Sequence, residues 1–157
     1  MRKIIMFPLM CICAFSLCAC SVVFPDEKQS ETYKTQHANS ALEYGIYMNK
    51  QITVYTNQLS THMMLLQNSD NTYENILPLA KESLEILQVT LDDVIVTFPS
   101  FDAEDDRETT ITLMKTAVKN MEDYIATLKE GKSATDFADK FQNDYFALTG
   151  MANLYYK

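Results

Sequence analysis

Glycine and proline are scarce in this chain: 3 and 4 of its 157 residues. Together with a hydrophobic content of 47%, this scarcity excludes collagen-like, low-complexity and intrinsically disordered proteins. Basic residues are also few, because 13 Lys and Arg stand against 21 Asp and Glu. The resulting net charge of −8 argues against a nucleic-acid-binding surface, since phosphates require a basic face. The length predicts a single domain.

Cysteine is missing from most of the chain. All four cysteines lie between residues 11 and 20, although four in a short chain would ordinarily suggest two disulfides or a zinc site. If residues 1–19 were cleaved off, Cys20 would be the one cysteine left in the chain. The cleaved chain would then have no disulfide, no Cys-based zinc site and no thiol nucleophile.

Histidine occurs only as His37 and His62. A di-iron bundle requires two Glu-x-x-His pairs, but Lys34 and Leu59 stand three residues before these histidines. The haem-attachment sequence Cys-x-x-Cys-His, the Gly-x-Ser-x-Gly elbow and Gly-rich phosphate loops are absent as well. We therefore expect no cofactor, no metal site and no enzymatic activity. The sequence His62-Met63-Met64 has ligands that suit Cu(I), but consecutive helical residues point about 100° apart and do not converge on one ion.

The N-terminus has the form of a targeting segment. Arg2 and Lys3 precede an apolar run over residues 4–17. A membrane-spanning helix needs about 20 apolar residues, so this run is better interpreted as the hydrophobic part of a signal peptide.

The run ends in Leu17-Cys18-Ala19-Cys20, which resembles the lipobox of bacterial lipoproteins. The resemblance implies cleavage before Cys20 and a diacylglyceryl group on that thiol, which would anchor the chain in a membrane. Lipidation at Cys18 would instead place the bulky Leu17 at the position that takes a small residue. A plain secretory signal and an uncleaved anchor helix are the alternatives. Cleavage would remove Arg2 and Lys3 but no acid, changing the net charge from −8 to −10.

The domain organisation follows from this assignment. We expect a signal peptide over residues 1–19, a lipidated cysteine with a tether over 20–29, and a folded domain over 30–157. Apolar residues recur at spacings of three and four in four segments of that domain, at about 30–67, 72–98, 103–130 and 134–157. Short turns between them imply antiparallel neighbours. The predicted fold is all-α, an up-down-up-down antiparallel four-helix bundle with a long first helix.

Particular residues refine these helices. Gly45 on the apolar seam of the first predicts a close approach by another helix. Asn71 and Glu74 fit a capping box for the second, whereas Ser133 and Asp136 form an approximate box for the fourth. Gly131 is a candidate C-cap of the third helix. Pro78 has two interpretations: a kink in the second helix, or a later start capped by Asn75.

The lipobox, the short tether, the long first helix and the turn Phe98-Pro99-Ser100-Phe101-Asp102 together resemble small helical-bundle lipoproteins of unknown function from Gram-positive bacteria. The resemblance implies an extracytoplasmic, lipid-anchored protein and supplies no catalytic residue. Ser21 after the lipidated cysteine would favour the outer membrane if the host were Gram-negative.

These observations predict non-enzymatic binding of a protein or peptide at the cell envelope. Tyrosine suits such contacts because its ring is rigid and its tip is polar. The acidic run that opens the third helix would suit a cationic peptide. The candidate surface residues are Tyr44, Tyr47 and Tyr55, and then Asp102, Glu104, Asp105 and Asp106. The alternative function is a carrier of copper, haem or lipid that uses a Met- and Tyr-lined cavity between the helices.

Overall fold

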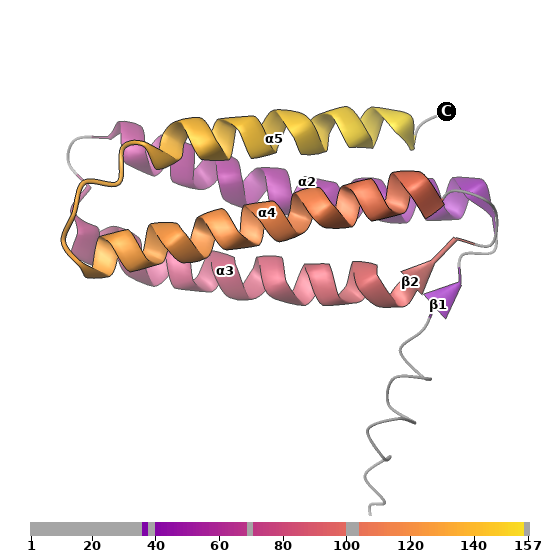
Figure 1. Ribbon diagram of the computed structural model, residues 1–157, viewed down its shortest axis with the longest axis horizontal. Helices are drawn as coiled ribbons and strands as arrows, with labels where there is room; N and C mark the ends of the chain where they lie inside the picture. Colours follow the sequence, from indigo (N-terminus) through magenta and orange to yellow (C-terminus); the bar gives the residue numbers. More distant parts are fainter. Residues whose placement is uncertain (1–35, 38–39, 69–70, 100–103, 156–157) are drawn as a thin grey trace, which may run out of the picture.

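The computed structural model describes residues 36–37, 40–68, 71–99 and 104–155. These residues form four helices: α2 (Ala41–Gln67), α3 (Tyr73–Val96), α4 (Glu104–Lys129) and α5 (Phe137–Leu154). Figure 1 shows them side by side along one long axis, with successive helices running in opposite directions. The predicted all-α, up-down-up-down four-helix bundle is confirmed.

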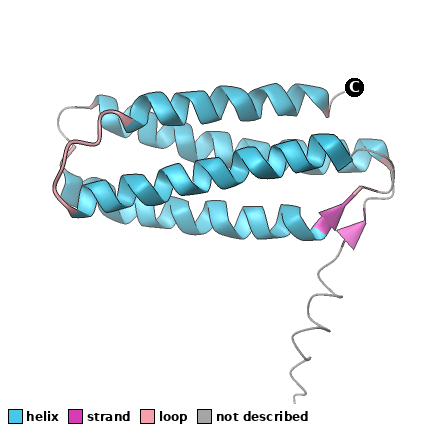
Figure 2. Ribbon diagram, viewed as in Figure 1, coloured by secondary structure: helices cyan, strands magenta, loops and turns pink. Residues whose placement is uncertain are grey.

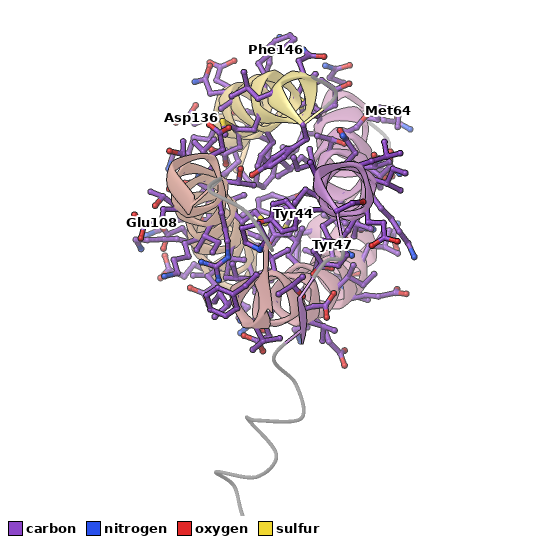
Figure 3. All side chains as sticks on the ribbon, turned by 90° about the vertical axis from the view of Figure 1, so that its right-hand side faces the viewer. Tyr44, Tyr47, Met64, Glu108, Asp136 and Phe146 are labelled. Atoms are coloured by element: carbon purple, nitrogen blue, oxygen red, sulfur yellow. The ribbon has the colours of Figure 1, made fainter. Side chains whose placement is uncertain are left out.

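The bundle is a closed ring of helices. Each helix packs against its neighbours in sequence, and α5 returns to pack along α2. The end-on view in Figure 3 shows the four helices around one shared core. The first and last helices therefore lie next to each other, although they are far apart in the sequence.

A short pairing of extended residues closes one end of the bundle. Figure 2 shows β1 (Gln36–His37) beside β2 (Thr97–Phe98), and the two strands pair in parallel over two residues. This pairing corrects the predicted first helix, because residues 36–37 are extended rather than helical. The helix α2 begins at Ala41, where the Ser40 hydroxyl accepts a hydrogen bond from the Glu43 amide at 3.2 Å. At 27 residues it is still the longest of the four.

The start of α3 also differs from the prediction. Thr72 occupies the N-cap position without a side-chain hydrogen bond, so the predicted Asn71–Glu74 capping box is wrong. The side-chain amide of Asn71 instead donates to the Leu65 carbonyl at 3.0 Å and connects the turn to the end of α2. A later start at Asn75 is wrong as well, because α3 already begins at Tyr73 and continues through the exposed Pro78.

The turn between α4 and α5 confirms one cap and corrects another. Gly131 has φ of 66°, its amide donates to the Leu128 carbonyl, and the next amide donates to the Thr127 carbonyl. This is a Schellman motif with glycine at the left-handed position, and it confirms Gly131 as the residue that caps the C-terminal end of α4. By contrast, α5 begins at Phe137 and its N-cap Asp136 makes no side-chain cap bond, so the predicted box with Ser133 is wrong.

In α4 the apolar residues that recur at spacings of three and four form a seam, and this seam lies in the core. All six of its apolar positions are buried: Ile111, Met114, Val118, Met121, Ile125 and Leu128. In α3 the predicted positions Ala80, Leu87, Leu91 and Val94 are buried as well. Leu77 and Leu84 are only half-buried, whereas Ile76 and Ser83 next to them are buried.

Candidate binding surface

Two of the tyrosines predicted to form a partner surface lie in the core. Tyr44 and Tyr55 on α2 have 0% exposure, so neither can contact a partner, and this part of the prediction is wrong. The Tyr55 hydroxyl donates to the Leu87 carbonyl of α3 at 2.7 Å, which lets the polar tip be buried without losing its hydrogen bond. Burial raises the pKa of Tyr55 above its usual range.

Tyr44 and Tyr47 lie close together on α2, with 6.4 Å between their ring centroids. The ring of Tyr44 packs edge-on against that of Tyr155, the C-cap residue of α5, with 5.9 Å between the ring centroids. Tyr47 is half-buried, and its hydroxyl donates to the Asp93 carboxylate of α3 at 2.8 Å. Tyr47 is thus the one predicted tyrosine that reaches the surface, and its hydroxyl already binds α3.

The acidic run at the start of α4 is only partly described. Asp102, like the lipidation candidate Cys20, lies outside the described residues, and Glu104 and Asp105 are the first two residues of α4. Asp106 is exposed, as expected for a surface residue.

Arg107 within that run is a structural cation that the sequence did not reveal. It is 5% exposed, and its guanidinium lies 4.1 Å from the centroid of the Phe98 ring. It donates to the Thr97 carbonyl at 3.1 Å and to the Ile95 carbonyl at 2.6 Å. The guanidinium therefore satisfies carbonyls at the C-terminal end of α3.

The side chains of residues 62–64 do not point toward a common metal position in the fold. His62 is fully buried, Met63 is half-buried and Met64 is 62% exposed. In Figure 3 Met64 points away from the core. Among the described residues, no three His, Cys, Asp or Glu side chains are grouped to hold a metal ion.

His62 instead belongs to a buried polar cluster. Its Nε2 lies 2.9 Å from the Ser83 hydroxyl, which donates to the Gln58 side-chain oxygen at 2.7 Å. Because that hydroxyl has one proton to give, Nε2 is the protonated nitrogen of a neutral imidazole. Burial lowers the pKa of His62 to about 4. The Nδ1 atom and the nearby Tyr124 hydroxyl have no hydrogen-bond partner among the described residues.

The side chains that a carrier would use are packed in the core. Met48, Met114 and Met121 have 0% exposure and belong to one continuous apolar cluster with Tyr44 and Tyr55. A ligand lodged there would have to displace these side chains.

The surface of the bundle is divided by charge. In its 27 residues α2 contains only two acidic or basic residues, Glu43 and Lys50. In α5 the charged residues are Asp139, Lys140 and the buried Asp144. The other two helices carry most of the charge: Glu74, Lys81, Glu82, Glu85, Asp92 and Asp93 on α3, and Glu104, Asp105, Asp106, Arg107, Glu108, Lys115, Lys119, Glu122, Asp123 and Lys129 on α4.

The weakly charged side also exposes large apolar side chains. Leu42, Ile46 and Met64 on α2 are 72%, 60% and 62% exposed, and Phe146 and Leu154 on α5 are 61% and 38% exposed. Figure 3 shows Met64 and Phe146 pointing outward from adjacent helices. We call the outward side of these two helices the α2/α5 face. The sequence does not reveal this face, because it exists only once α5 packs along α2.

A hollow opens on the α2 part of this face. It measures about 380 Å³ and is lined by Ile46, Asn49, Lys50, Thr53, Val54 and Asn57. Its walls combine amide, hydroxyl and aliphatic groups with a single charged side chain. We call it the α2 hollow.

Comparisons of the chain with protein-family models, with curated proteins and with solved structures found no match. Within the described residues, no helix combines the length and apolar character that crossing a membrane requires.

Proposed function

We propose that this protein is a non-enzymatic binding protein of the bacterial cell envelope, anchored in the membrane by lipid on Cys20. The lipobox-like sequence supports the anchor. The observation that carries the binding role is the α2/α5 face, on which apolar side chains are exposed in a region poor in charge.

The composition of this face matches that of protein interfaces. The centre of an interface is depleted in Lys, Glu and Asp and enriched in aromatic side chains and Met. Ile46, Met64 and Phe146 provide apolar anchors, and Thr53 and Asn57 provide uncharged hydrogen-bonding groups. Single exposed apolar residues are common on soluble proteins, but a group of them on adjacent helices indicates an interaction site.

The anchor is tested by metabolic labelling with palmitate. The native chain and Cys18→Ala should incorporate the label and remain in the membrane fraction, whereas Cys20→Ala should do neither. Cys18→Ala is the matched control because it removes a neighbouring thiol and leaves the proposed acceptor intact. Label that persists in Cys20→Ala would contradict the assignment.

The binding role is tested by chemical crosslinking in intact cells, followed by electrophoresis of membrane extracts. The native chain should form a discrete higher-mass complex that is lost in Ile46→Asp. Val89→Asp is the control, because Val89 is 64% exposed but lies on α3, outside the face. A complex that survives Ile46→Asp and disappears in Val89→Asp would assign binding to another side of the bundle.

A further inference from the structure

We propose that the α2/α5 face binds a second copy of this chain, forming a two-fold symmetric dimer. The inference rests on the proposed function only in using the same face. It goes further in naming the partner, and four features of the structure support it.

Charge restricts how two copies can meet. Each copy has a net charge of −8 as synthesised, and its charged residues are concentrated on α3 and α4. Contact through those helices would bring Glu82, Glu85 and Glu122 close to the same acids of the other copy, and like charges oppose association. Contact through the α2/α5 face keeps the acidic sides apart, on opposite outer surfaces of the dimer.

The size of the face is suitable. At 1.5 Å per residue and roughly 10 Å width per helix, the 27 residues of α2 and the 18 of α5 present on the order of 700 Å². Specific complexes bury about 800 Å² on each partner. A second copy seated on the whole face would therefore bury an area close to that of a stable dimer.

The face is also self-complementary along the bundle axis. Gly45 of α2 lies against the carbonyl of Tyr155, which fixes the relative height of the two antiparallel helices. Phe146 precedes Tyr155 by nine residues and Val54 follows Gly45 by nine, so both lie at one level. A two-fold axis parallel to the helices preserves level and exchanges α2 with α5. It brings Phe146 of each copy to the α2 hollow of the other, as an isologous contact requires.

A lipid surface fits the face less well. Helices that lie in a membrane interface flank their apolar stripe with Lys and Arg, which reach the anionic headgroups. Lys50 is the basic residue of α2, and Lys140 that of α5. The remaining polar groups beside the exposed apolar side chains include Thr53 and Asn57, which suit hydrogen bonding across a protein interface.

Photo-crosslinking tests the contact in the native membrane. The analogue p-benzoylphenylalanine at position 146 of the full chain should, on irradiation, give a product of twice the monomer mass. Peptide mapping should place the second attachment site within residues 46–57. The same analogue at position 108, on the exposed Glu108 side of α4, is the control and should give no such product.

Sedimentation equilibrium of the full chain in density-matched detergent measures the association itself. Ile46→Asp and Phe146→Asp should each raise the dimer dissociation constant at least tenfold, a loss of about 1.4 kcal/mol or more. Val89→Asp should change it less than twofold. All three positions are at least 60% exposed, so circular dichroism should show an unchanged fold.

The outcomes separate this inference from the proposed function. A chain that sediments as a monomer at every concentration overturns the dimer. So does a crosslink from position 146 to a different protein, although that result would leave the envelope-binding role intact. Loss of palmitate labelling in native cells would reject the anchor without affecting the dimer. A mapped crosslink from position 146 to residues 46–57 of a second copy supports the inference directly.

Discussion

At the residue scale, the buried polar cluster around His62 is the least expected feature of the core. Ser83 connects His62 with Gln58, so that three polar side chains from α2 and α3 satisfy one another. Buried polar groups cost little when they are paired and much when they are not. Burial disfavours the protonated imidazole of His62, which makes the fold sensitive to acid at this residue.

This sensitivity predicts a pH-dependent stability. The pKa of His62 is about 4 in the fold and about 6.5 in the unfolded chain, so the unfolded state takes up the proton first. The contribution of the neutral His62 to the free energy of unfolding is therefore complete above pH 6.5 and is lost as the pH falls toward 4. Between pH 7.5 and 4.5, urea unfolding should show a loss of about 2–3 kcal/mol that is missing from His62→Gln.

Other groups that titrate in this range do so in both proteins. Burial raises the pKa of the Asp144 carboxyl above its usual value, and this carboxyl is present in both proteins. The difference between native and His62→Gln therefore isolates the imidazole. Equal losses in the two proteins would show that His62 does not govern the acid response.

The two helical glycines predict opposite responses to alanine. A Cβ on Gly45 would collide with the backbone carbonyl of Tyr155, whereas one on Gly150 would enter open space. Alanine gains about 1 kcal/mol in helix propensity at either site, but overpacking costs about 1–3 kcal/mol. Gly150→Ala should raise the free energy of unfolding by about 0.5–1 kcal/mol, and Gly45→Ala should lower it. Denaturant unfolding measures both, and stabilisation by Gly45→Ala would contradict the close contact between α2 and α5.

At the element scale, the end of α3 is held by a residue from the next helix. Arg107 of α4 donates to carbonyls at Ile95 and Thr97 and stacks on Phe98. A cation at this position also interacts favourably with the negative end of the helix dipole. One side chain of α4 therefore satisfies carbonyls at the end of α3 and links the two helices there.

Arg107→Lys should consequently be destabilising although it preserves the charge. An ammonium group lacks the planar fork that reaches two carbonyls while stacking on a ring. We expect a loss of about 1–3 kcal/mol in the free energy of unfolding. Lys119→Arg in the same helix is the control, since Lys119 is exposed and its change should be close to zero. Equal stability of Arg107→Lys and the native chain would show that the charge alone matters.

The helices themselves were largely predictable, and the exceptions have physical causes. The seam of α4 was correct because its apolar residues fall on one stripe without polar interruption. In α3 the buried positions include Ser83 and Thr90, which apolar periodicity cannot identify. Ser83 is buried because α2 supplies its partners, and Thr90 because its hydroxyl donates to the Ile86 carbonyl within α3.

The tyrosines of the candidate surface likewise show that sequence periodicity does not decide whether a particular side chain is buried. A tyrosine side chain has an apolar ring and a polar tip, so the sequence alone allows Tyr44 and Tyr55 to lie in the core or at a surface. Burial of Tyr55 depends on a hydrogen bond to the Leu87 carbonyl, a contact made only when α2 and α3 are packed. The sequence could identify a bundle, but the orientation of individual side chains required the tertiary contacts.

At the scale of the whole molecule, the division of charge is the property that the sequence did not reveal. Net charge is a sum over the chain, whereas the α2/α5 face results from which helices become neighbours. Because α5 returns to α2, the two helices poorest in charge adjoin, and the acids of α3 and α4 are gathered on the other side. Repulsion among those acids opposes folding most strongly at low ionic strength.

A graded charge series on α3 tests that repulsion. Glu82 lies three residues before Glu85 on the exposed side of α3, a spacing at which like charges repel. Glu82→Gln should raise the melting temperature by about 1 °C in 10 mM salt, and Glu82→Lys by about 2–3 °C because it also creates an attractive pair. At roughly 0.15 M salt these gains should shrink, since the Debye length falls to about 8 Å. Gains that are independent of salt would point to helix propensity rather than to the acidic surface, and the division of charge would then have no energetic consequence.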